Sequence, residues 1–129
     1  MHVLILEPDR VLAGQMASYF ELAGHTTALH PDPQAAVNSI DKQRPNVIIT
    51  ELELAGRSGV EFLYELRSYP EWLDIPVIIY SGLPADQASA YQPIFTQLNI
   101  KAYLPKNVIG LAELTDQVNS LRPAANAKV

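Results

Sequence analysis

The chain has 129 residues, a formal net charge of −5 and no cysteine. This length fits one domain with a core of its own, and the lack of cysteine excludes disulfides and thiolate metal sites. The acidic balance argues against a nucleic-acid surface, which needs a basic stripe, and no apolar segment is long enough to span a bilayer. We therefore expect a cytoplasmic domain without a nucleic-acid or membrane partner.

The first half of the chain alternates short apolar runs with stretches of helical spacing. Continuous apolar runs of this length are typical of strands that are buried on both faces. Asp9 is placed to cap the first helix, and Asp32 followed by Pro33 is placed to start the second. We expect a strand over 3–6, a helix between 9 and 24, a weak edge strand over 26–29, a helix between 32 and 44, and a strand over 47–50.

The second half continues the same alternation. Ser58 and Glu61 have the capping-box spacing that begins a third helix, and Pro93 weakens the prediction for the fourth helix because it removes a hydrogen bond. We expect helices over 58–70, about 84–98 and 111–121, separated by strands over 77–80 and 101–104.

Five alternations of strand and helix predict an α/β fold of the flavodoxin-like, doubly wound kind. Parallel strands need crossover connections, so helices should cover both faces of a five-stranded parallel sheet. The expected strand order is 2-1-3-4-5. The sequence predicts one domain over 1–122 and a flexible C-terminal tail over 123–129, where the pattern is lost.

Polar residues follow the central strands at the points where these strands end. They are Glu7, Asp9, Glu51, Ser81 and Lys106. Taken singly, each is more often a loop residue, but the carboxyl ends of parallel strands share one edge of the sheet, where ligands collect. Acids, a hydroxyl and an ammonium around one point indicate a phosphoryl-binding or metal-binding site.

These motifs resemble the receiver domain of two-component response regulators, including the chemotaxis response regulators, over nearly the whole chain. The resemblance rests on 7–9 (Glu-Pro-Asp), on 50–59 around Glu51, on 79–82 ending in Ser81-Gly82, and on 102–106 with Tyr103 and Lys106. It implies a non-enzymatic signalling domain without catalytic residues of its own. A partner histidine kinase would pass a phosphoryl group to an aspartate beside Mg²⁺ held by acids.

The resemblance also implies roles for individual residues. Glu51 stands at the phosphoacceptor position, and Glu7 and Asp9 form the acidic cluster. Ser81, Tyr103 and Lys106 are the switch residues, of which the hydroxyl and the lysine grip the phosphoryl group. The output face would consist of the fourth helix, the fifth strand and the fifth helix.

This sequence departs from the family pattern at two positions that bear on the chemistry. Glu51 replaces the acceptor aspartate, and Pro8 replaces an acid that would be a Mg²⁺ ligand. Glutamate is one methylene longer, and in-line transfer tolerates little misplacement. A Mg²⁺ site made of Glu7, Asp9 and Glu51 would therefore be weakened, because Mg²⁺ demands strict octahedral oxygen geometry. Ala55 and Asn107 also stand where the family has proline.

Our leading hypothesis is a stand-alone, receiver-like domain that aspartate phosphorylation does not switch, with Glu51 as a phosphoryl mimic. It would act through a signalling protein partner or a homodimer formed by the output face. The alternative is a Mg²⁺-dependent phosphoacceptor still modified by a histidine kinase. An engineered acceptor in an ordinary receiver would leave Pro8 unexplained. A flavin or nucleotide carrier is not expected, because no glycine-rich loop follows the first strand.

Overall fold

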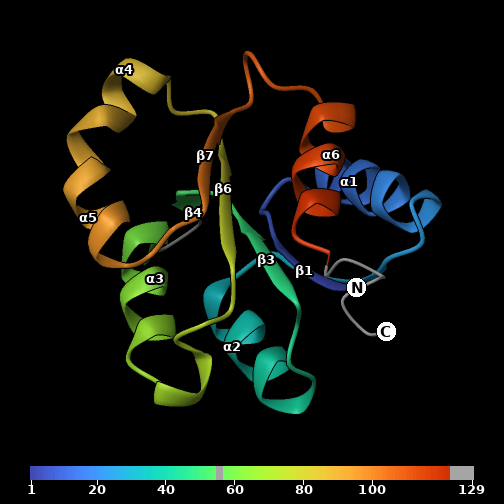
Figure 1. Ribbon diagram of the computed structural model, residues 1–129, viewed down its shortest axis with the longest axis horizontal. Helices are drawn as coiled ribbons and strands as arrows, with labels where there is room; N and C mark the ends of the chain where they lie inside the picture. The colour runs from blue at the N-terminus through green and yellow to red at the C-terminus, as the bar shows by residue number, and fades with distance from the viewer. Residues whose placement is uncertain (55–56, 123–129) are drawn as a thin grey trace, which may run out of the picture.

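The computed structural model describes residues 1–54 and 57–122, and these form a three-layer α/β structure (Figure 1). The predicted tail over 123–129 and the loop positions 55 and 56 lie outside the described residues. The strands are β1 (His2–Leu6), β2 (Thr26–His30), β3 (Val47–Thr50), β4 (Glu53–Leu54), β5 (Arg57–Ser58), β6 (Val77–Ser81) and β7 (Ala102–Pro105). The helices are α1 (Arg10–Leu22), α2 (Pro33–Lys42), α3 (Gly59–Arg67), η1 (Pro70–Trp72), α4 (Ala85–Ala88), η2 (Ser89–Tyr91), α5 (Gln92–Gln97) and α6 (Leu111–Ser120).

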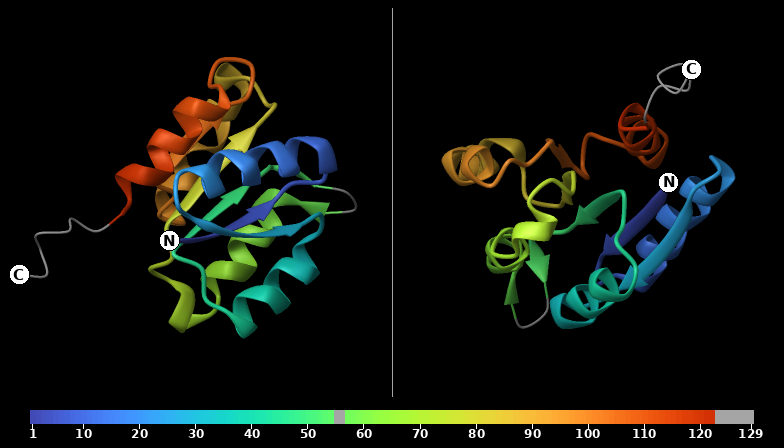
Figure 2. Two further views of the ribbon diagram at one scale, coloured as in Figure 1. Left: turned by 90° about the vertical axis from the view of Figure 1, so that its right-hand side faces the viewer. Right: turned by 60° about the horizontal axis from the view of Figure 1, so that its bottom comes forward.

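Five parallel strands form the main sheet in the order β2-β1-β3-β6-β7. Counted along the chain within this sheet, that is the predicted order 2-1-3-4-5. The fold class is therefore confirmed, and β2 and β7 are the two edge strands. Crossovers of this kind place helices on both faces (Figure 2), as the handedness of parallel connections requires.

Each face of the sheet has a hydrophobic core of its own. Alternate residues of a strand point to opposite faces, so Val3 and Ile5 pack with α1 and α6, while Leu4 and Leu6 pack with α2, α3 and α5. All four of these strand residues are at most 1% exposed. Both faces of β1 are thus covered, which explains why its sequence is a continuous apolar run rather than an alternating one.

Side-chain caps fix where several helices begin. The Asp9 carboxylate accepts hydrogen bonds from the amides of Val11 and Leu12 at the start of α1, and Asp32 caps α2 in the same way through the Ala35 amide. Ser58 caps α3 through the Val60 amide. These three helix starts agree with the sequence prediction.

The predicted fourth helix is not continuous. It is divided into α4, the 3-10 turn η2 and α5, and Pro93 lies in the first turn of α5, where its missing N–H costs no helix bond. The two-stranded hairpin β4-β5, beside the sheet, was not predicted. Asn99 adopts the left-handed conformation expected at the end of this region, with φ of 55°.

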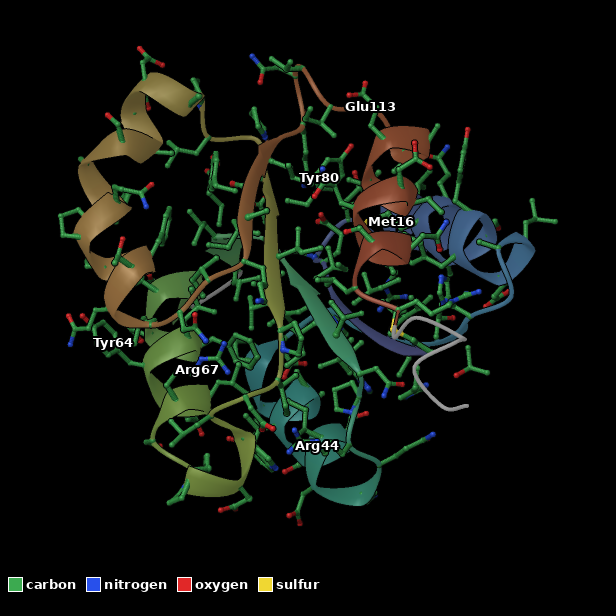
Figure 3. All side chains as sticks on the ribbon, viewed as in Figure 1. Met16, Arg44, Tyr64, Arg67, Tyr80 and Glu113 are labelled. Atoms are coloured by element: carbon green, nitrogen blue, oxygen red, sulfur yellow. The ribbon has the colours of Figure 1, made fainter. Side chains whose placement is uncertain are left out.

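Arg67 joins α3 to the segment that follows α5. Its guanidinium donates to the carbonyl oxygens of Leu98 at 2.9 Å, Trp72 at 2.9 Å and Asn99 at 3.3 Å (Figure 3). It thereby satisfies carbonyls that the end of a helix leaves without intrahelical partners. Among the described residues, no helix combines the length and the apolar character needed to cross a membrane.

Candidate functional site

Four predicted side chains meet at the carboxyl edge of the main sheet. Glu7 follows β1, Glu51 follows β3, Ser81 ends β6, and Lys106 follows β7. The strand ladders continue into this region, because the Glu51 amide donates to Leu6 O at 3.0 Å and the Lys106 amide donates to Ser81 O at 2.8 Å. The sheet therefore places an acid, an acid, a hydroxyl and an ammonium side by side.

The Lys106 ammonium lies between the two acids. Its Nζ is 2.6 Å from Glu7 Oε1 and 2.7 Å from Glu51 Oε1. The side chains of Glu7 and Glu51 are 4% and 7% exposed, and that of Lys106 is 22% exposed. Buried charges require partners of this kind, since an unpaired charge in the interior is costly. We call Glu7, Glu51 and Lys106 the charged triad.

The Glu51 carboxylate is enclosed by hydrogen-bond donors. Oε1 accepts from Lys106 Nζ and from the Gly82 amide at 3.2 Å, and Oε2 accepts from the amides of Leu52 at 2.5 Å and Glu53 at 3.2 Å. An ionised carboxylate offers about four lone-pair positions, and these four donors match them. We call this set of donors around Glu51, together with the Ser81 hydroxyl, the anion cradle.

The surroundings of Glu51 and Lys106 shift the pKa values of these two groups. Burial acts to raise the pKa of Glu51, but hydrogen bonds from Lys106, from Ser81 and from the Glu53 amide outweigh it and lower that pKa. Burial acts to lower the pKa of Lys106, but its hydrogen bonds to Glu51 and Glu7 outweigh it and raise that pKa. Both shifts favour the charged forms, as expected when opposite charges lie within hydrogen-bonding distance.

Asp9 does not join the triad. Its carboxylate caps α1, and its own amide donates to Glu7 Oε2 at 3.0 Å. The structure does not bring Glu7, Asp9 and Glu51 together as three metal ligands: in the described part of the chain, no group of three or more histidine or acid side chains is placed to hold an ion. The physical reason is competition, because the free amides of the first helical turn bind the Asp9 side chain.

The remaining donors at this edge do not fit Mg²⁺ either. Pro8 has no side-chain oxygen, and the lone pairs of Glu51 are already used by N–H donors. The Lys106 ammonium stands between Glu7 and Glu51, where a cation bridging the two acids would have to lie. An octahedral ion needs several free oxygens at short, regular distances, and this arrangement does not supply them.

Tyr103 is tied to the loop that follows β6. Its hydroxyl donates to the carbonyl of Leu83, and the amide of Leu83 donates to Ser81 Oγ at 3.2 Å. The Tyr103 ring is stacked on Phe95 of α5, with ring centroids 5.8 Å apart. Ser81, Leu83 and Tyr103 therefore link the anion cradle to α5.

Several components of the site were not predicted from the sequence. The amides of Leu52, Glu53 and Gly82 have no sequence signature, because every residue except proline carries the same donor. Gly59, the first residue of α3, lies close to the site: a Cβ at this position would lie 2.6 Å from the Glu51 carbonyl oxygen. Its spacing after Glu51 gave no indication of this close approach.

Comparison with known proteins agrees with this geometry. Residues 3–119 match the family model described as the response regulator receiver domain. The structure resembles the chemotaxis response regulator CheY4 of Vibrio cholerae, with 16% identity, a TM-score of 0.82, and coverage of 94% of this chain and 98% of that one. It also resembles the Francisella response regulator 1452 receiver domain, with 26% identity, a TM-score of 0.80, and coverage of 93% and 94%.

Curated relatives are longer than this chain. The phosphate regulon transcriptional regulatory protein PhoB of Escherichia coli is 23% identical over 109 residues, which are 83% of this chain and 48% of PhoB. An uncharacterized 76.5 kDa protein of Thiocystis violacea is 30% identical over 79 residues, 61% of this chain and 11% of that protein. The chain thus spans about half or less of these relatives. With the family model covering most of its length, the chain belongs to the response regulator receiver domain family.

Proposed function

We propose that this receiver domain is a protein-binding module in two-component signalling that aspartate phosphorylation does not switch. The observation that carries the proposal is the position of the Glu51 carboxylate in the anion cradle, where Lys106 and three backbone amides donate to it. The Ser81 hydroxyl also acts to lower its pKa. In this proposal the Glu51 carboxylate takes the place that a transferred phosphoryl group would otherwise occupy.

The same contacts make Glu51 a poor phosphoacceptor. A nucleophile needs a free lone pair aligned with the donor phosphorus, and the Glu51 oxygens are engaged by N–H donors on both sides. The lowered pKa of Glu51 keeps its carboxylate anionic, but the hydrogen bonds that lower this pKa also occupy its oxygens. Phosphoryl transfer also relies on a cation that neutralises the developing charge, and the Mg²⁺ affinity of this edge is expected to be weak because its acids are already paired with Lys106.

Glu51 would act instead by holding the switch segment in one arrangement. The Gly82 amide bonds to Glu51, and the next residue, Leu83, bonds through its amide to Ser81 and through its carbonyl to Tyr103. These bonds fix the loop between β6 and α4 and keep Tyr103 beside Phe95. In this proposal the domain presents one constant surface to its partner.

We place the partner contact on the predicted output face, which consists of the segment α4-η2-α5, of β7 and of α6. A hollow of about 240 Å³ lies there beside Tyr103, and its other lining residues are Ala85, Ala88, Ser89, Gln92 and Phe95. Small and aromatic side chains around a shallow hollow suit a protein contact. The partner would be a signalling protein, and a homodimer through this face is the alternative occupant.

Intact mass spectrometry tests the proposal. The wild-type chain and the double variant Glu51→Asp/Pro8→Asp would be incubated with acetyl phosphate and Mg²⁺, and each would be weighed before and after. We expect no mass change for the wild type, because its anion cradle is full. The double variant is the matched control, in which a shorter acceptor and a second acid restore the family pattern. A stoichiometric phosphoryl adduct on the wild type would overturn the proposal in favour of a working phosphoacceptor.

A further inference from the structure

The outer edge of β2 carries hydrogen-bonding groups that the sheet does not use. β2 pairs with β1 alone, through contacts such as the Thr26 amide to Met1 O at 3.0 Å and the Glu7 amide to His30 O at 3.1 Å. Backbone groups alternate along a strand with a period of two, so Thr26, Ala28 and His30 face β1. The N–H and C=O groups of Thr27 and Leu29 therefore face outward.

This edge lacks the features that usually protect exposed strands. Natural edge strands are shortened, bulged, or marked by proline or lysine. The opposite edge strand, β7, follows Lys101 and ends in Pro105. By contrast, β2 is five residues of continuous strand with the sequence Thr-Thr-Ala-Leu-His, and Leu29 is 43% exposed. Such a strand is a template for the addition of another strand.

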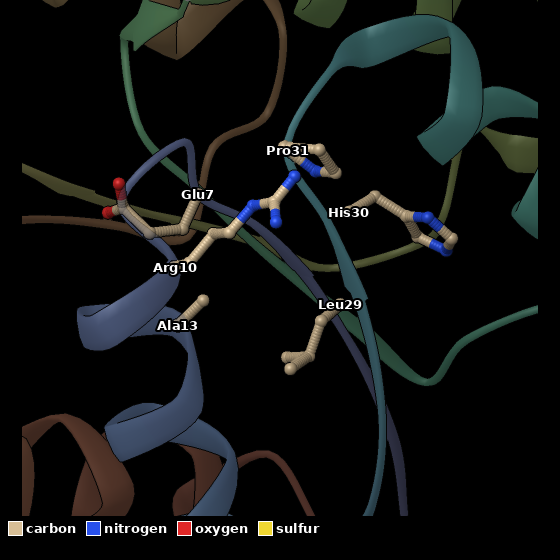
Figure 4. Close-up of a pocket in the computed structure, with 6 residues that line it drawn as sticks. All are labelled: Glu7, Arg10, Ala13, Leu29, His30 and Pro31. Atoms are coloured by element: carbon tan, nitrogen blue, oxygen red, sulfur yellow. The ribbon is translucent and has the colours of Figure 1, made fainter.

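A hollow flanks β2 on each face of the sheet. On the α1 side, a hollow of about 300 Å³ has apolar walls from Ala13, Leu29 and Pro31, with Arg10 beside them. Figure 4 shows the Arg10 side chain reaching toward Pro31, while the Glu7 carboxylate and the His30 ring lie to opposite sides. On the α2 side, a hollow of about 410 Å³ is lined by residues that include His30, Asn38, Ser39 and Lys42.

We propose that the outer edge of β2 binds an extended segment of a partner protein in which apolar and acidic residues alternate. Side chains of an added strand point alternately to the two faces, so apolar ones would enter the hollow beside Leu29 and acidic ones would meet Lys42. In the described chain, neither Arg10 nor Lys42 forms an ion pair with an acid. Asp9, which precedes Arg10 in the chain, is used as the cap of α1.

A second copy of this chain fits the edge less well than such a partner. The β2 segment contains no carboxylate that could meet Lys42 or Arg10 of another copy. Charge complementarity therefore favours an acidic segment from a different protein.

The test uses the whole chain, labelled with ¹⁵N, and three synthetic six-residue peptides. One alternates valine with glutamate, one has the same composition in two blocks, and one alternates valine with lysine. We expect only the first to bind, with shifts and slowed hydrogen exchange at the amides of Thr27 and Leu29. Perturbation confined to other surfaces, or no perturbation at millimolar peptide, would overturn the proposal.

Two variants distinguish strand addition at β2 from nonspecific electrostatic attraction between the domain and the peptide. Leu29→Pro removes an outward N–H that the ladder to β1 does not use, so the fold should tolerate it, and binding should weaken at least about tenfold. Lys42→Glu should weaken binding about fivefold, whereas Lys101→Glu, beside the other edge strand, should not. Unchanged binding in Leu29→Pro would contradict the mechanism. Protection of the Thr27 and Leu29 amides in a dimer of the chain alone would show that the occupant is a second copy.

Discussion

Replacing Lys106 with methionine should destabilise the domain strongly at neutral pH. Methionine keeps much of the side-chain volume but removes the ammonium that is 2.6 Å from Glu7 and 2.7 Å from Glu51. Removing one partner of a buried ion pair typically costs about 3–5 kcal/mol, because the other charge stays buried without compensation. Glu51 keeps three amide donors, and Lys106 is partly exposed, so we expect about 3 kcal/mol.

The pH dependence should distinguish the variant from the wild type. In the wild type, the lowered pKa of Glu51 stabilises the fold above its ordinary value of 4.5, and this contribution is lost as the pH falls below it. The raised pKa of Lys106 stabilises the fold below 10.5, and this contribution is lost as the pH rises further. Between these values the two groups give a flat profile.

Without Lys106, burial is the dominant influence on the Glu51 carboxyl and raises its pKa. The ionised carboxylate then destabilises the fold at neutral pH, and protonation relieves this. The free energy of unfolding of Lys106→Met should therefore increase as the pH falls from neutral toward the ordinary glutamate pKa of 4.5, while that of the wild type stays level.

Urea unfolding measures both effects, with the fluorescence of the buried Trp72 as the signal. Lys101→Met is the matched control, because Lys101 is exposed and lies outside the charged triad; it should cost at most about 0.5 kcal/mol. A loss of less than about 1 kcal/mol for Lys106→Met, or a profile parallel to that of the wild type, would refute the reasoning.

Three other substitutions give further tests by urea unfolding. Gly59→Ala should cost about 1–3 kcal/mol, because the new Cβ would lie 2.6 Å from the Glu51 carbonyl oxygen; a neutral result would mean that the loop shifts freely. Tyr103→Phe should cost about 0.5–1.5 kcal/mol by removing the bond to Leu83 O, and the resonances of the ring should then show exchange, whereas a single set of sharp signals would argue against a hydroxyl latch. Asp9→Ala should cost about 0.5–2 kcal/mol as a lost cap, and this cost should be the same with and without Mg²⁺; a cost that grows when Mg²⁺ is added would restore Asp9 as a ligand.

The sequence predicted the sheet and its edge because the physical signals there are strong. A short, mostly apolar run such as 47–50 is typical of a strand that is buried on both faces of a sheet. Five strands joined by crossovers leave few topologies. The residue that follows each run then lies at the carboxyl edge, and for this reason Glu7, Glu51, Ser81 and Lys106 could be grouped before any coordinates existed.

Other features depend on short-range competition that the pattern does not resolve. Asp9 could serve as a cap or as a ligand, and the free amides of α1 decide in favour of the cap. A single 3-10 turn, η2, separates α4 from α5. Over three residues, the spacing of apolar side chains in a 3-10 turn cannot be distinguished from that in an α-helix. The hairpin β4-β5 has two residues in each strand, too few for any period to be detected.

The central claim is that the Glu51 carboxylate fills an anion cradle made by the rest of the chain. Glu51→Ala empties this cradle while leaving Lys106 and the amides of Gly82, Leu52 and Glu53 in place. The most direct measurement is the unfolding midpoint of wild type and variant as inorganic phosphate is added at constant ionic strength. The account predicts that phosphate raises the midpoint of the variant and leaves the wild type unchanged. An equal response of the two proteins, or none in the variant, would contradict it.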